Sequence, residues 1–73
     1  MAESLDVFAI LGNEEYLWIG CVFTKDDAIR LISERGLQIP AASFLVRSQR
    51  TGNRTFYKTG HNNTILQLED VAD

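Results

Sequence analysis

Apolar residues recur at helical spacing between Thr24 and Gly36 and nowhere else in the chain. The apolar stripe of this segment consists of Ala28, Ile29, Leu31 and Ile32. Thr24 is a favourable N-cap, and Asp27 follows it at the spacing of a capping box. Gly36 is expected to end the helix in a left-handed conformation. The segment therefore predicts one short amphipathic helix.

The other apolar stretches have the composition of β-strands separated by turns. Strands are predicted at residues 7–11, 16–23, 44–50, 54–59 and 65–68. Pro40 lies in a connector at residues 38–43, because proline disfavours both helix and central strand. The order β-β-α-β-β-β predicts a small single α+β domain over residues 1–73, with frayed ends at 1–5 and 70–73. An antiparallel sheet with the helix packed on one face is the expected architecture.

The second strand is apolar on both sides, which predicts a central strand or one with a face covered by a partner. Gly20 within it indicates a bulge or a close backbone approach. Tyr16 and Trp18 share one face of this strand. They belong either to the core or to a surface for a protein partner or homodimer, since a single helix covers only one sheet face.

The composition, with 45% hydrophobic and 23% charged residues, is that of a soluble globular domain. No apolar segment is long enough to span a bilayer and no signal peptide is recognisable, so we expect a cytoplasmic protein without membrane association. The net charge of −3 disfavours nucleic-acid binding by the whole surface. Residues 36–58, however, contain four basic residues and no acidic one.

These four basic residues all lie in a predicted hairpin at residues 44–60. A two-residue turn at Gly52-Asn53 pairs Thr51 with Arg54 and Arg47 with Lys58. One side of the hairpin then carries Gln49, Arg47, Arg54, Phe56 and Lys58, while Phe44, Val46 and Tyr57 face the core. Basic residues around an aromatic ring favour binding of an anion or a nucleic-acid strand. The alternative is that they serve solubility or pair with acidic residues of the same chain.

No motif predicts catalysis, a cofactor or a metal site. The single histidine, His61, falls in a turn without a neighbouring nucleophile, and Cys21 lies in the most apolar strand as a small hydrophobe. The leading hypothesis is a non-catalytic interaction or regulatory module that binds a protein or a second copy of itself. It would use Tyr16 and Trp18 or the basic hairpin. The alternative is nucleic-acid binding through the hairpin.

Overall fold

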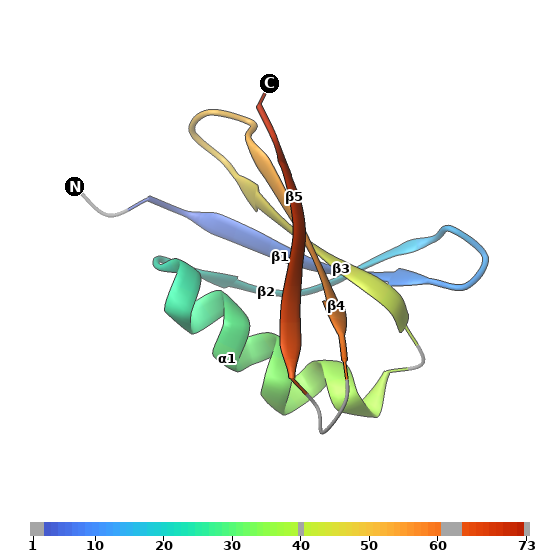
Figure 1. The fold of residues 1–73 in the computed structure, drawn as a ribbon. Coiled ribbons are helices and arrows are strands. Elements are labelled where there is room, and N and C mark those ends of the chain that lie inside the picture. Colours follow the sequence, from blue (N-terminus) through green and yellow to red (C-terminus); the bar gives the residue numbers. More distant parts are fainter. Residues whose placement is uncertain (1–2, 40, 61–63, 73) are drawn as a thin grey trace.

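A computed structural model describes residues 3–39, 41–60 and 64–72. The described residues form one helix, a short 3-10 helix and five strands (Figure 1). In chain order these are β1 (Leu5–Leu11), β2 (Tyr16–Val22), α1 (Lys25–Arg35), η1 (Gly36–Gln38), β3 (Ala41–Ser48), β4 (Arg54–Thr59) and β5 (Ile65–Val71).

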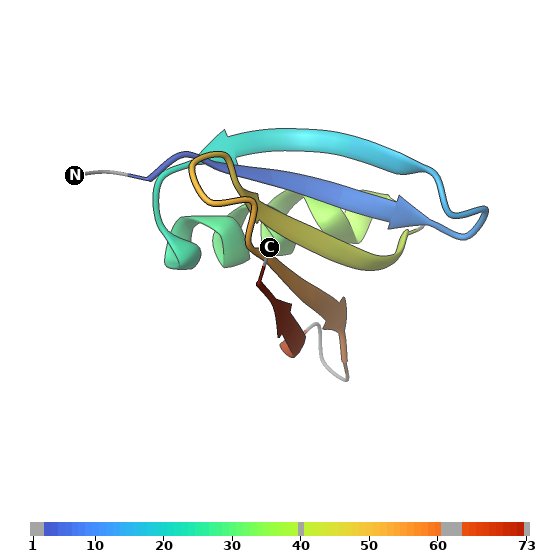
Figure 2. The same ribbon diagram turned by 90° about the horizontal axis from the view of Figure 1, so that it is seen from above.

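The strands build one antiparallel sheet in the order β2-β1-β3-β4-β5, which confirms the predicted α+β fold. The helix α1 lies along one side of the sheet, and β5, at the far edge, runs steeply across the direction of β1 (Figures 1 and 2). Sheets twist because of the handedness of L-residues, and this twist curls the far strands around the helix. Of the two alternatives predicted for β2, the central position is wrong, because β1 pairs with β3 and leaves β2 at an edge.

The helix begins as the sequence predicts and ends differently. Thr24 accepts a hydrogen bond from the backbone N–H of Asp27 at 3.0 Å, so the N-cap is confirmed. Gly36 has φ −63° and ψ −30°, and the chain continues into η1 instead of closing in a left-handed turn. The reason for glycine is space: a Cβ there would lie 2.6 Å from Cζ of Phe44. Gly36 thus allows the helix end to rest on a core ring.

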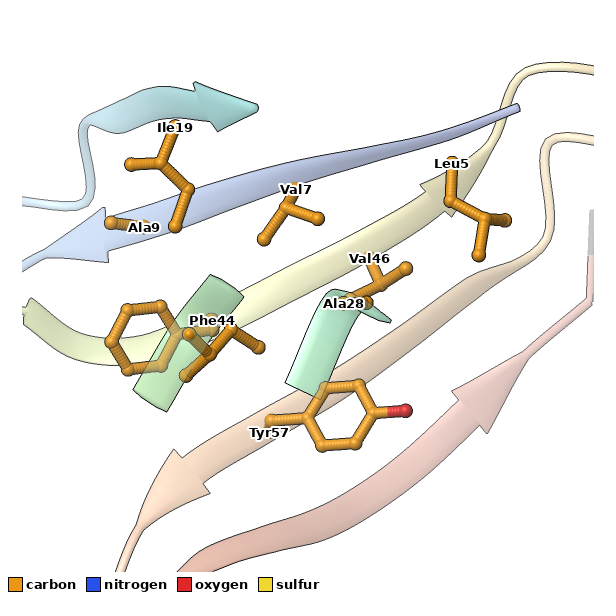
Figure 3. Packing of buried hydrophobic residues seen from close by; sticks show 9 residues of the cluster. Leu5, Val7, Ala9, Ile19, Ala28, Phe44, Val46 and Tyr57 are labelled. Carbon is orange, nitrogen blue, oxygen red and sulfur yellow. The ribbon is translucent and has the colours of Figure 1, made fainter. Parts of the chain in front are cut away.

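The core lies between α1 and one face of the sheet. Its side chains come from alternate positions of the strands and from Ala28 and Ile32 of α1, both fully buried. The predicted core face of the hairpin, Phe44, Val46 and Tyr57, is confirmed. Figure 3 shows these three side chains with Ala28 among the packed residues. Strand periodicity of two therefore divides each strand into a helix-facing side and an opposite side.

The bounds of several strands differ from the prediction at their ends. Leu5 belongs to β1, and β5 extends through Asp70 and Val71, so these residues of the expected frayed ends are paired strand residues. The strand β3 begins at Ala41, inside the expected connector, and ends at Ser48. Pro40 and the turn residues 61–63 lie outside the described residues.

The predicted hairpin register is wrong by four residues. Arg47 pairs with Arg54 and Phe44 with Tyr57, because the loop between β3 and β4 contains residues 49–53. Gly52 supplies the expected positive φ, 78°, and its N–H donates to the carbonyl of Ser48 at 2.9 Å. A shift by an even number of residues leaves each side chain on its predicted face. The faces are therefore correct although the partners are not.

Candidate interaction surface on the open face of the sheet

The side of the sheet opposite α1, here called the open face, carries a continuous apolar band. Cα pairing aligns Trp18 of β2, Phe8 of β1, Leu45 of β3 and Phe56 of β4 in one row across four strands. Leu45, at the centre, is only 5% exposed, although no described element covers this face. Its cross-strand partners are Phe8 and Phe56, so an aromatic residue flanks it on each side. The band therefore runs without interruption from β2 to β4.

The aromatic side chains of β2 form the exposed end of this band. Trp18 is 57% exposed and Tyr16 is 56% exposed. The Tyr16 ring packs edge-on against Phe8, with 6.4 Å between ring centroids and an interplanar angle of 74°. Such edge-to-face contacts stabilise aromatic pairs and restrict how their rings move. Tyr16 is therefore held in place while most of its surface faces solvent.

A β-bulge in β2 determines which of its side chains face α1 and which lie on the open face. The pairing with β1 shifts between Val7 and Phe8, so that Val7 pairs with Gly20 and Phe8 with Trp18. Ile19 is the extra residue, and it is buried in the core. A Cβ at Gly20 would lie 2.6 Å from Leu31 of α1, so both predictions for Gly20, bulge and close approach, are confirmed. Cys21 is exposed, so the expectation that it lies in apolar surroundings as a small hydrophobe is wrong.

Asp6 links β2 to the β3–β4 loop on the open face. Its carboxylate accepts a hydrogen bond from Nε1 of Trp18 at 3.2 Å and from Nε2 of Gln49 at 2.9 Å and 3.0 Å. Hydrogen bonds to a charged acceptor are stronger than neutral ones, and two donors from distant segments converge on this group. Asp6 therefore orients the indole of Trp18 and fixes the start of the loop.

Two arginines lie side by side next to the apolar band. Arg47 pairs with Asp6 on one side and with Arg54 on the other. Within residues 3–39, 41–60 and 64–72, neither arginine nor Lys58 has a carboxylate within ion-pair distance. Nε of Arg54 is shielded from solvent and has no hydrogen-bond partner among the described residues. Like charges opposite each other on a sheet disfavour pairing, so this position favours an anionic group that would lie between them.

The structure brings together the two groups of residues that the sequence singled out separately. Tyr16 and Trp18 of β2 occupy the same face as Arg47 of β3 and Arg54, Phe56 and Lys58 of β4, and β1 lies between β2 and β3. Sequence reasoning missed Phe8 and Leu45, which join the two groups, and Asp6. The uninterrupted apolar runs around Phe8 and Leu45 do not reveal which residues face outward. The sequence does indicate that an open face exists, because a single helix can cover only one face of the sheet.

A hollow of about 460 Å³ lies on the helix side, between the start of α1 and the ends of β3, β4 and β5. Three of its polar side chains form hydrogen bonds: Thr55 donates its hydroxyl to Asp70 at 2.6 Å, and Ser48 Oγ accepts from the N–H of Thr51 at 3.2 Å. Burial, and secondarily the charge of Asp70, raises the pKa of Tyr57 above its ordinary value of 10.0. The hydrogen bonds of Thr55 and Ser48 stabilise this end of the sheet.

Neither a metal-ligating cluster nor a membrane-spanning helix occurs among the described residues. In that part of the chain, no three His, Cys, Asp or Glu side chains lie close enough together to hold a metal ion. His61 lies outside the described residues. Of the helical segments described, none has the length and apolar character needed to cross a bilayer.

Comparison of the chain with models of protein families, with curated proteins and with solved structures gives no match. The geometry of the open face is therefore the basis on which a function is proposed.

Proposed function

We propose that this protein is a non-catalytic interaction module that binds a protein partner through the open face of its sheet. The observation that carries the proposal is the row from Trp18 to Phe56, an aromatic and apolar band that α1 does not cover. Exposed apolar patches of this kind mark protein-binding surfaces, and interface centres are enriched in aromatic residues and arginine. The open face has both.

The charges beside the band indicate the chemistry of the partner. Arg47 and Arg54 lack a carboxylate partner in the described part of the chain, whereas Asp6 is occupied by two hydrogen-bond donors. A partner with apolar side chains for the band and a carboxylate next to the arginines would relieve their repulsion. Arginine suits this role because its planar guanidinium binds carboxylates in a bidentate manner.

The proposal is tested by photo-crosslinking from defined positions. A crosslinking residue at Tyr16 reports on the open face, and the same residue at Glu34, exposed on α1, is the matched control. The expected result is a specific crosslinked protein from position 16 and none from position 34. With that protein purified, Trp18→Ser and Phe56→Ser should each weaken binding by about tenfold or more, since interface aromatics are frequent hot spots.

The control for these variants is Arg30→Ser, because Arg30 is exposed on α1, on the opposite side of the molecule, and pairs with Asp27 of its own helix. Its affinity for the partner should equal that of the wild type. Equal affinities of Trp18→Ser, Phe56→Ser and wild type, with all variants folded by circular dichroism, would contradict the open face as the binding surface.

A second candidate function, binding of single-stranded nucleic acid, is favoured by one observation. Arg47 and Arg54 stand opposite each other beside Phe56, so that two cations lie next to a ring on which a base can stack. Fluorescence titration with short single-stranded DNA and RNA at two salt concentrations tests it. Binding that weakens steeply with salt and is lost in Arg47→Gln would support this function. Binding that is insensitive to salt, or none, would exclude it.

A further inference from the structure

The indole of Trp18 is largely exposed to solvent, yet its polar group is already in use. Its Nε1–H donates to Oδ1 of Asp6, which lies on the neighbouring strand β1, at 3.2 Å. A tryptophan side chain has one hydrogen-bond donor and no acceptor, so this contact uses its whole polar capacity. What Trp18 offers to a partner at this end of the apolar band is therefore the surface of its rings.

The carboxylate of Asp6 is itself held from the loop between β3 and β4. Gln49 donates from Nε2 to both oxygens of Asp6, and its backbone N–H donates to the carbonyl of Ser4 at 2.9 Å. Among the described residues, Arg47 is the cross-strand neighbour of Asp6 in β3 but forms no ion pair with it. Asp6 is therefore engaged by Gln49 and Trp18, while the charge of Arg47 stays available to a partner.

We infer that Asp6 is a positioning residue, which holds the indole of Trp18 in the orientation that the protein partner binds. This inference rests on the proposed function of the open face. An exposed side chain otherwise samples several rotamers, and immobilising it in an interface opposes binding. The hydrogen bond to Asp6 restricts the indole before the partner arrives, so less freedom is lost on binding and the complex is tighter.

Fluorescence of the free protein tests the positioning directly, because Trp18 is the single tryptophan of the chain. Time-resolved anisotropy of the wild type should show the indole rotating with the whole domain. Asp6→Ala removes the acceptor and should add a fast local rotation. Asp6→Asn is the matched control, since it removes the same charge but keeps an oxygen that can accept from the indole, and its anisotropy decay should equal that of the wild type. A fast component in the wild type, or none in Asp6→Ala, would overturn the inference.

Binding to the protein captured by crosslinking from position 16 tests the consequence for affinity. Asp6→Ala should bind that protein about three- to tenfold more weakly than Asp6→Asn, as expected when one large side chain must be immobilised on binding. Both variants lose the negative charge next to Arg47, so the difference between them reports on the hydrogen-bond acceptor alone. Equal affinities of Asp6→Ala and Asp6→Asn would overturn the inference.

A double-mutant cycle shows whether Asp6 acts through Trp18 or by another route. Phenylalanine at position 18 has a ring but no N–H to donate. In a Trp18→Phe background, Asp6→Ala and Asp6→Asn should therefore bind the captured protein equally. A difference that persists in this background would mean that Asp6 acts through Gln49 and the loop, and it would overturn the inference.

Failure of the inference and failure of the proposed function give different results. If Trp18→Ser and Phe56→Ser bind the captured protein as tightly as the wild type, the proposed function fails and the inference fails with it. If both variants weaken binding while Asp6→Ala and Asp6→Asn bind equally, the open face is the binding surface and only the inference fails.

Discussion

Arg47 and Arg54 are direct cross-strand neighbours on the open face, and the described residues supply no carboxylate within ion-pair distance of either. Two guanidinium groups in this position repel each other, and Nε of Arg54 is also buried, with no hydrogen-bond partner in the part of the chain that the structure describes. Such an arrangement lowers the stability of the free protein, which is common where side chains are positioned for a partner.

The repulsion between the two arginines leads to a prediction for folding. Arg54→Gln should raise the free energy of unfolding by about 0.5 kcal/mol, because it removes a like charge from a directly opposed pair. Urea unfolding followed by circular dichroism measures this change. Arg50→Gln, at an exposed position in the loop of the same hairpin, should leave the stability unchanged. A loss of stability in Arg54→Gln would show that the arginine has a stabilising contact instead.

The end of α1 depends on the absence of a side chain at Gly36. Gly36→Ala should lower the free energy of unfolding by about 1–3 kcal/mol, since the new Cβ would press on a buried ring. The contact involves Cζ and Cε1 of Phe44, at 2.6 and 2.8 Å, and this ring is only 2% exposed. Gly12→Ala is the control, because a Cβ there meets nothing within 4 Å. Thermal or urea unfolding of both variants should separate them clearly.

The loop between β1 and β2 contains a residue in an unfavourable conformation. Glu14 has φ 67°, a left-handed value that costs an L-residue about 1–2 kcal/mol. Glu14→Gly should therefore stabilise the protein by about 0.5 kcal/mol, after the greater flexibility of glycine in the unfolded chain is included. Glu15→Gly changes the same charge without relieving this strain and should not stabilise. Equal midpoints of urea unfolding for the two variants would contradict the prediction.

Tyr57 makes stability sensitive to alkaline pH. Its pKa is raised in the folded state by burial and then by Asp70, whereas in the unfolded chain it titrates near the ordinary value of 10.0. The unfolded state therefore loses its proton first, so the contribution is intact below pH 10 and is lost as pH rises above it. Tyr57→Phe should remove this part of the alkaline loss, measured by unfolding at several pH values.

The matched control for this pH dependence is Tyr16→Phe, because Tyr16 is exposed on the open face and Tyr57 is buried in the core. Its unfolding free energy should fall with alkaline pH as steeply as that of the wild type. If Tyr57→Phe shows the same steep fall, then ionisation of Tyr57 is not its cause.

The local features of this protein follow from short stretches of its sequence. The cap at Thr24, the apolar stripe of α1 and the alternation in β4 follow from interactions between residues a few positions apart. The face on which Arg54, Phe56 and Lys58 lie was also predictable. Side chains alternate along a strand, so the predicted faces are correct although the predicted pairing is shifted by four residues.

Which residues the open face brings together depends on the tertiary fold. The position of β1 between β2 and β3 joins residues distant in the sequence, and it places Trp18 and Phe56 in one band. The conformation of Gly36 likewise depends on the ring of Phe44, which arrives from another element. Such contacts come from packing of the whole core, where many weak and non-directional interactions act together, so no short stretch of sequence specifies them.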